Sequence, residues 1–223
     1  MYTLRIAILS GGTVNNLQWL SGILDHTDRI ICVDGGSKYA SSLGIVPYMV
    51  IGDMDSICPD ELDRFTGLGV IIKKYLPEKD DSDTALALAE TLAQNPTEIL
   101  FLGAVGTRLD HTMANIHLLR TAAKNGVQAK LINEHNEISL IAPGQIEVVE
   151  GSPGDLFSLL PLTTEVTGIR VQGARWPLED ATFEIGNPYG LSNRLAAERV
   201  NISIKSGLVL LIKVNEQGKA RCG

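Results

Sequence analysis

The sequence has few cysteines, no run of basic residues and no long apolar segment. Its three cysteines, Cys32, Cys58 and Cys222, are far apart and include no C-x-x-C pair, so neither a zinc site nor a disulfide framework is expected. The formal net charge of −7, without any basic run, argues against a nucleic-acid partner. No apolar run approaches the ~20 residues of a membrane span, and the first residues lack the pattern of a signal peptide. We therefore expect a cytoplasmic protein that does not bind a membrane.

Two common glycine-rich nucleotide motifs are also missing. Ser10-Gly11-Gly12 does not continue as G-x-G-x-x-G, and the chain holds no G-x-x-x-x-G-K-[ST] sequence. Any nucleotide chemistry in this chain would therefore use neither a Rossmann fingerprint nor a P-loop.

The first 136 residues alternate short apolar runs with segments of helical periodicity. Strands are expected at residues 5–9, 29–33, 48–51, 70–73, 99–102 and 128–132. Helices are expected at residues 15–24, 37–43, 60–66, 83–93 and 111–124. Such alternation predicts parallel pairing and a layered α/β sheet.

From residue 137 the pattern changes to short β-rich runs, several of them separated by turn-forming residues. These runs cover residues 137–141, 145–149, 156–160, 164–171, 181–185, 199–204 and 209–214. Many short strands at regular spacing predict a sandwich or barrel. The predicted fold is a layered parallel-sheet α/β nucleotide domain (residues 1–136) followed by an all-β sandwich domain (residues 137–223).

Acidic residues gather where predicted strands of the first domain end. The three segments are Gly52-Asp53-Met54-Asp55-Ser56, Lys79-Asp80-Asp81-Ser82-Asp83 and Arg108-Leu109-Asp110-His111. Ligands of an open α/β sheet bind at the carboxyl ends of its strands, and like charges brought together there call for a cation. Mg²⁺ prefers oxygen ligands and usually brings substrate phosphates with it. The segments therefore predict a site for magnesium and a nucleotide.

Each acidic pair also has a simpler interpretation. Asp53 and Asp55 face the same side of an extended segment, but aspartates also form turns by bonding to their own backbone. Asp80 and Asp83 share a face at a helix start, where they can cap the helix or favour its dipole. The same helix start attracts phosphate, and Lys79 adds a positive charge there.

A third group consists of Arg108, Asp110, His111 and Asn115. Arg108 follows a glycine-containing loop and can fork onto phosphate oxygens, whereas a surface ion pair is the alternative. His111 and Asn115 are four residues apart and share a helix face. Asp34, which begins a D-G-G sequence, belongs either to a plain turn or to a contact with a ribose or an amine.

In combination these segments are far more specific than any one of them. D-G-G, G-D-x-D-S, K-D-x-S-D and G-x-x-G-x-R-x-D-H-x-x-x-N occur in this order, followed by Tyr189-Gly190-Leu191-Ser192-Asn193 in the β-rich part. In order and spacing, over nearly the whole chain, the sequence resembles the thiamine pyrophosphokinase family. The resemblance implies transfer of pyrophosphate from ATP to the hydroxyl of thiamine, with release of AMP. It also implies an N-terminal α/β nucleotide domain, a C-terminal β-sandwich, and a homodimer with two sites at its interface.

The resemblance further implies roles for individual residues. The implied magnesium ligands are Asp53, Asp55, Asp80 and Asp83, and the implied catalytic residues are Asp55, Asp80, Asp110 and Arg108. The implied ATP contacts are Asp34, Lys79, Arg108, His111 and Asn115, and the implied thiamine contacts are Trp176, Ser192 and Asn193. One departure is Thr107, which stands where the family usually has a second glycine before the arginine.

These residue types suit the implied reaction. Phosphoryl-type transfer depends mainly on positioning and on neutralising charge, which Mg²⁺, Arg108 and Lys79 would supply. A carboxylate near the acceptor hydroxyl can act as a base, and Asp55, Asp80 and Asp110 are equal candidates. Trp176 offers an aromatic face to the cationic ring of thiamine, although a tryptophan near a strand start is just as typical of a core.

Two other functions would use the same residues. In a metal-dependent phosphohydrolase acting on a nucleotide or a phosphorylated metabolite, the aspartates would activate water. A non-catalytic nucleotide or thiamine sensor would need no dense acidic cluster beside the phosphates. The products distinguish the three: AMP with thiamine diphosphate, inorganic phosphate, or no product.

Overall fold

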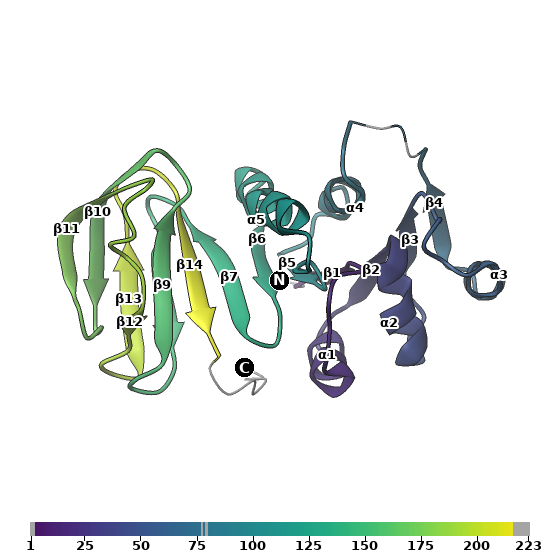
Figure 1. Ribbon diagram of the computed structural model, residues 1–223, viewed down its shortest axis with the longest axis horizontal. Helices are drawn as coiled ribbons and strands as arrows, with labels where there is room; N and C mark the ends of the chain where they lie inside the picture. Colours follow the sequence, from purple (N-terminus) through teal and green to yellow (C-terminus); the bar gives the residue numbers. More distant parts are fainter. Residues whose placement is uncertain (1–2, 77, 79, 216–223) are drawn as a thin grey trace. The chain divides into compact units, whose positions relative to one another are not determined.

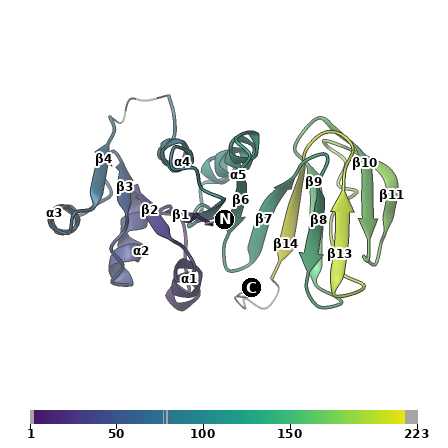
Figure 2. The same cartoon turned by 180° about the vertical axis from the view of Figure 1, so that it is seen from behind.

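The computed structural model describes residues 3–76, 78 and 80–215, so Lys79 of the predicted site lies outside this part of the chain. The chain divides into two compact units, and the division falls between Glu134 and His135. Figures 1 and 2 show the elements of each unit from opposite sides. Among the described residues, no helix is both long enough and apolar enough to cross a membrane.

The first unit is built on a parallel sheet. Within the described residues, its strands lie in the order β6, β5, β1, β2, β3, β4. Their bounds are β1 Arg5–Leu9, β2 Arg29–Val33, β3 Met49–Gly52, β4 Ile71–Lys74, β5 Glu98–Leu102 and β6 Gln128–Ile132. The last four residues of β1 are apolar and fully buried, as expected of a parallel strand that is covered on both faces.

Helices cover both faces of this sheet. Their bounds are α1 Leu17–Leu24, η1 Asp34–Gly36 (a 3₁₀ turn), α2 Ser37–Ser42, α3 Pro59–Gly67, α4 Asp83–Leu92 and α5 Leu109–Lys124. Figures 1 and 2 show α1 and α2 on one face and α4 and α5 on the other. On the first face, Trp19, Tyr39 and Phe65 pack with Leu9 and Val50 of the sheet. The predicted alternation of strand and helix is confirmed.

Two helix starts matter for the predicted site. Ser82 accepts a hydrogen bond from the backbone N–H of Ala85 (3.2 Å), and this cap begins α4 at Asp83. α5 begins at Leu109, two residues earlier than predicted, so Asp110 belongs to its first turn. Both helix N-termini follow strands and therefore start at the carboxyl edge of the sheet.

The second unit is an antiparallel β-sandwich. One sheet has the strand order β12, β9, β14, β7 and the other β11, β10, β13, β8. The bounds are β7 Asn136–Ile141, β8 Ile146–Glu150, β9 Leu156–Pro161, β10 Glu165–Gln172, β11 Leu178–Glu184, β12 Asn193–Arg194, β13 Arg199–Ser203 and β14 Val209–Val214. Side chains of both sheets, among them Phe157, Val166, Phe183, Ile202 and Leu211, form one buried core. The predicted fold class is confirmed.

Two strands of this unit differ from the prediction. β12 has two residues, which is too few to produce a periodic pattern in the sequence. β11 begins three residues earlier than predicted, because Leu178 pairs with Val171 of β10. In both cases pairing with a neighbouring strand decides the structure, and local sequence preference does not.

Candidate active site

Predicted site residues of the first unit lie where its strands end. Asp34 directly follows β2, Asp53 directly follows β3, and Arg108 follows the loop after β5. Because the strands are parallel and β1 lies between β5 and β2, these ends share one edge, with the glycine turn after β1 near its middle. α4 and α5 start at the same edge, because each follows a strand of this parallel sheet.

Asp34 and Gly52 contact each other across the ends of β2 and β3. Asp34 has a φ of 43°, and Gly52 has a φ of 145°, where L side chains are strained. A Cβ atom at Gly52 would lie 1.6 Å from Oδ1 of Asp34. Only a glycine at position 52 therefore leaves room for the Asp34 carboxylate. This carboxylate lies against Gly52, directly before Asp53.

Asp53 to Ser56 form a turn. Met54 has a φ of 69°, and the backbone N–H of Asp55 donates to Oδ1 of Asp53 (3.0 Å). Ser56 Oγ donates to Oδ1 of Asp55 (2.8 Å). The expected extended geometry is therefore wrong, because residue 54 is left-handed and aspartates stabilise turns through their own backbone. Both carboxylates nevertheless remain accessible to solvent at this edge.

Ser82, and neither neighbouring aspartate, caps α4. Asp83 lies in the first helical turn, partly buried, where its charge favours the helix dipole. Asp80 is exposed in the preceding loop. Within the described residues, no three acidic, histidine or cysteine side chains converge closely enough to enclose a metal ion by themselves.

Arg108 and Asp110 form a two-pronged ion pair. Arg108 donates to Oδ2 of Asp110 (2.6 Å) and to Oδ1 (3.3 Å). The hydrogen bond from Arg108 lowers the pKa of the Asp110 carboxyl below its usual value, and the same bond raises the pKa of Arg108. The side chains are 69% and 64% exposed. Such an exposed pair contributes little to stability, so either partner can be exchanged for a ligand.

His111 and Asn115 lie in different environments although they are four residues apart on α5. His111 is exposed, whereas Asn115 is only 7% exposed. Nδ2 of Asn115 donates to the carbonyl oxygen of Ala104 (2.8 Å). Asn115 thus stabilises the loop between β5 and Arg108 through a buried hydrogen bond. The spacing of His111 and Asn115 on one helix face does not predict this contact.

The turns after β1 and β5 are joined through their backbones. The N–H of Gly12 donates to the carbonyl oxygen of Gly103 (2.7 Å). A Cβ atom at Gly12 would lie 2.4 Å from that oxygen, so the close approach requires glycine. The hydroxyl of Tyr39 donates to Gly12 O and accepts from Val14 N–H (3.2 Å). Tyr39 was not predicted from the sequence, because a tyrosine in a helical segment has the same pattern as a core residue.

The predicted thiamine contacts lie together in the second unit. Asn193 is buried; its Nδ2 donates to the carbonyl of Trp176 (2.7 Å), and its Oδ1 accepts from the N–H of Trp176 (3.2 Å). The Trp176 side chain is 51% exposed, so the core interpretation is wrong, and the Arg175 guanidinium lies 5.0 Å from the ring centroid. Ser192, at a φ of 59°, donates its N–H to Ser158 Oγ (3.1 Å).

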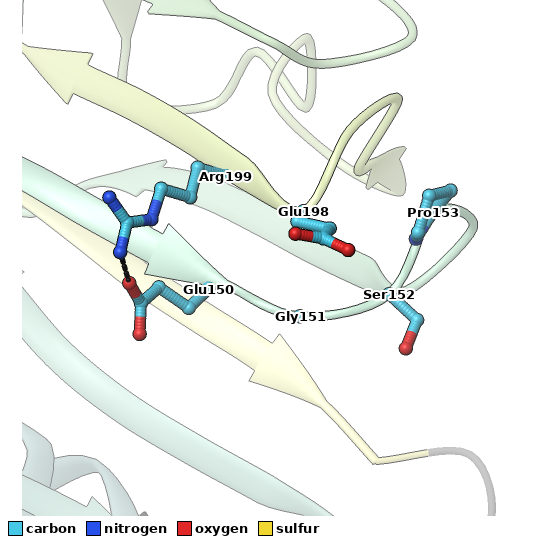
Figure 3. A pocket seen from close by; sticks show the side chains of 6 residues that line it. All are labelled: Glu150, Gly151, Ser152, Pro153, Glu198 and Arg199. Carbon is cyan, nitrogen blue, oxygen red and sulfur yellow. Dashed lines mark ion pairs between the residues drawn. The ribbon is translucent and has the colours of Figure 1, made fainter.

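A separate open hollow of the second unit contains none of the predicted residues. It has a volume of ≈ 330 Å³ and lies where β8 ends and β13 begins. Figure 3 shows its lining, which consists of Glu150, Gly151, Ser152, Pro153, Glu198 and Arg199. Arg199 pairs with Glu150 at 2.8 Å across one side of it. The hollow therefore has no link to the predicted chemistry.

Both units match models of known domains. Residues 20–131 match "Thiamin pyrophosphokinase, catalytic domain", and residues 145–209 match "Thiamin pyrophosphokinase, vitamin B1 binding domain". The first match lies within the first compact unit and the second match within the second.

Similarity to known proteins extends over nearly the whole chain. The chain is 30% identical over 208 residues to thiamine pyrophosphokinase of Bacillus subtilis (strain 168), covering 93% of this chain and 97% of that protein. It is 27% identical over 178 residues to thiamine pyrophosphokinase 1 of Oryza sativa subsp. japonica, covering 75% and 66%. The crystal structure of thiamine pyrophosphokinase from Bacillus subtilis matches with a TM-score of 0.86 and 29% identity, over 95% of this chain and 99% of that one. The chain therefore belongs to the thiamin pyrophosphokinase family, which confirms the predicted diphosphotransferase and leaves the phosphohydrolase alternative unsupported.

Proposed function

We propose that the carboxyl edge of the first domain binds ATP with Mg²⁺, and that the second domain binds thiamine and forms the dimer. Pyrophosphate then passes from ATP to the thiamine hydroxyl, giving thiamine diphosphate and AMP. The observation that carries this proposal is the pair of separate family matches, at residues 20–131 and 145–209. The first contains the acidic strand ends, and the second contains the exposed Trp176 ring.

The donor atoms at this edge fit Mg²⁺. Asp53 and Asp55, with Asp80 and Asp83, offer the carboxylate oxygens that this ion prefers, and Mg²⁺ typically takes one or two carboxylates together with substrate phosphates. When bound, Mg²⁺ would neutralise charge on the phosphates.

Arg108 is proposed to contact the phosphates. Its planar guanidinium already makes two parallel hydrogen bonds to Asp110, and a phosphate offers the same geometry. Nucleotide binding would therefore exchange one two-pronged partner for another. The hydrogen bond that lowers the pKa of Asp110 would be lost in this exchange, so Asp55, Asp80 and Asp110 stay equal candidates for removing the hydroxyl proton.

Of the remaining proposed ATP residues, some can touch the nucleotide and one supports a loop. His111 is exposed in the first turn of α5, and Asp34 lies beside the Asp53 turn, so both can reach a ligand at this edge. Lys79 is proposed on the motif alone. Asn115 is buried against Ala104 and would act by shaping the loop that carries Arg108.

Thiamine is proposed to stack on Trp176. The ring is half exposed and already lies near one cation, the Arg175 guanidinium; a cationic thiazolium would use the same attraction. Asn193 fixes both backbone polar groups of Trp176 and so holds the ring in place. Ser192 lies directly before Asn193 in a left-handed turn, where its hydroxyl can contact the ligand.

We also propose that the protein is a homodimer and that it is cytoplasmic. The second domain exposes the large apolar side chains Trp176, Ile185, Tyr189 and Leu191, and exposed apolar groups of this size often mark interfaces. Cys58 is an exposed free thiol and Cys32 a buried one, which suits a reducing compartment.

Product analysis tests the proposal. Purified protein given ATP, thiamine and Mg²⁺ should produce AMP and thiamine diphosphate in equal amounts, detected by chromatography. Chelation of the metal by EDTA should stop turnover, and added Mg²⁺ should restore it. Asp53→Asn should lower turnover by ~10²–10³-fold, the usual cost of removing electrostatic stabilisation of transfer. Release of inorganic phosphate without AMP, or turnover in EDTA, would contradict the proposal.

A further inference from the structure

Lys38 lies at the same edge as the acidic residues, and neither the motifs nor the proposed function uses it. It is the second residue of α2, just after the Asp34–Gly36 turn that ends β2. Its neighbours on both sides are buried: Ser37 donates to Glu61 (3.1 Å), and the Tyr39 hydroxyl donates to Gly12 O. The backbone of Lys38 is therefore held in place while its side chain faces solvent.

The Lys38 side chain lies along this edge towards the glycine turn after β1. Nζ is 4.7 Å from the centroid of the Tyr39 ring and 3.3 Å from the carbonyl oxygen of Gly11. Beside it, the exposed Gly11 has no side chain and lies against the backbone of Gly35, which a Cβ atom at Gly11 would approach to 3.2 Å. A surface without side chains lets an oxyanion approach both the ammonium group and the chain.

No acidic side chain in the described part of the chain forms an ion pair with Lys38. Within the described part of the chain, no carboxylate oxygen lies within 4.0 Å of Nζ, and the contacts of the side chain are the Gly11 carbonyl and the Tyr39 ring. The same edge nevertheless carries Asp34, Asp53 and Asp55. A polyphosphate that enters this edge is repelled by these negative charges. The Lys38 ammonium group, which contacts only a neutral carbonyl and a ring among the described residues, is available to attract it.

We infer that Lys38 binds the polyphosphate of the nucleotide. The strand order places Lys38 on the β2 side of the Gly11–Gly12 turn and Arg108 on the β5 side. A triphosphate that lies across the turn would thus meet one cation from each side. This inference rests on the proposed binding of ATP at this edge, and it gives Lys38 a role in nucleotide affinity.

The test uses Lys38→Gln, which removes the charge and keeps most of the side-chain length. The KM for ATP should rise about 10-fold, because a charge-assisted hydrogen bond to a phosphate contributes on this order. The KM for thiamine should not change, and kcat should stay within about twofold, as for loss of a binding interaction made equally in ground and transition states. Lys38→Arg should retain most of the affinity.

Isothermal calorimetry gives a readout that does not need turnover. Because the reaction cleaves the α–β phosphate link, α,β-methylene-ATP with Mg²⁺ is a stable probe. Its affinity should fall about 10-fold in Lys38→Gln, whereas the affinity for AMP should be unchanged. Lys124→Gln is the matched control, since this exposed lysine ends α5 at the opposite edge of the sheet. Circular dichroism verifies the fold of each variant.

The outcomes separate this inference from the proposed function. Equal binding of α,β-methylene-ATP by wild type and Lys38→Gln would overturn the role of Lys38, even if the wild type makes thiamine diphosphate. A change confined to the KM for thiamine would also overturn it, because Lys38 would then serve the acceptor. Weaker binding of the analogue in Lys38→Gln supports the inference whatever products the wild type releases.

Discussion

At the scale of single residues, the geometry of the acidic edge depends on glycine as much as on the carboxylates. Gly52 has a backbone conformation that L side chains rarely adopt, and the Asp34 carboxylate occupies the space that a Cβ atom would take. This packing brings a carboxylate from the end of β2 beside the start of the Asp53 turn. Gly52 is therefore expected to act through the placement of Asp34.

Gly52→Ala should lower turnover on the order of 10²-fold, because the added methyl group displaces a carboxylate from an electrostatically tuned site. The strained φ should also cost about 1–3 kcal/mol of unfolding free energy. Steady-state assays for AMP release and urea unfolding measure the two effects separately.

Gly22→Ala is the matched control for Gly52→Ala. Gly22 lies within α1 and a Cβ atom there has open space around it, so this change should stabilise the protein by ~0.5–1 kcal/mol and leave activity unchanged. Asp34→Asn adds no backbone strain, because asparagine also tolerates the left-handed φ of this position, and it should reproduce the loss of activity alone. Wild-type turnover by a folded Gly52→Ala protein would refute the contact as a functional one.

At the scale of elements, strand ends and helix starts hold one another in position. The turns after β1 and β5 share the hydrogen bond from Gly12 to Gly103. Tyr39 of α2 braces the first turn, and Asn115 of α5 braces the second through Ala104. Arg108 lies between this second turn and the first residue of α5. By holding Ala104, α5 therefore also helps to fix the position of Arg108.

Asn115→Ala should lower the free energy of unfolding by ~1–3 kcal/mol, because it leaves the buried carbonyl of Ala104 without a donor. The KM for ATP should rise together with this loss, since the loop before Arg108 is released. Urea unfolding and ATP kinetics on the same protein measure both.

His111→Ala provides the comparison for stability. His111 is exposed on the same helix, so its removal should change stability by no more than about 0.5 kcal/mol. If Asn115→Ala were as stable as the wild type and yet bound ATP weakly, Asn115 would be a direct ATP contact and not a support.

At the scale of the whole molecule, the two proposed binding functions belong to separate compact units. The proposed nucleotide residues all precede Glu134, and the proposed thiamine residues all follow His135. We propose that the active enzyme is a homodimer in which the acidic edge of one chain works with the Trp176 region of its partner. Each active site would then need two chains.

Subunit mixing tests this arrangement. Asp53→Asn and Ser192→Ala should each be strongly impaired alone, because each damages both sites of its own dimer. After exchange of equal amounts, about one quarter of wild-type activity should return, since half of the dimers are mixed and each mixed dimer has one unaltered site. Native mass spectrometry verifies the exchange. Confirmed exchange without recovered activity would mean that each site is built from a single chain.

Much of the fold is predictable from the chain because burial leaves a periodic pattern. The apolar strand runs, the helix of strong formers after Ser82 and the change of pattern near residue 136 all follow from local preference and hydrophobic periodicity. The helix start at Leu109 and the two-residue strand β12 are exceptions. The extended backbone at Arg108 sets the first, strand pairing sets the second, and neither repeats along the sequence.

The candidate site divides in the same way. The sequence alone predicted which residue types would carry the chemistry and, through the parallel order of strands, that the segments around Asp53 and Arg108 would lie at one edge of the sheet. Only the tertiary structure decided that Asp53 and Asp55 form a turn, that Asn115 faces Ala104, and that Asn193 holds Trp176. These contacts join residues through burial, left-handed backbone and hydrogen-bond partners from other elements, none of which a linear pattern records.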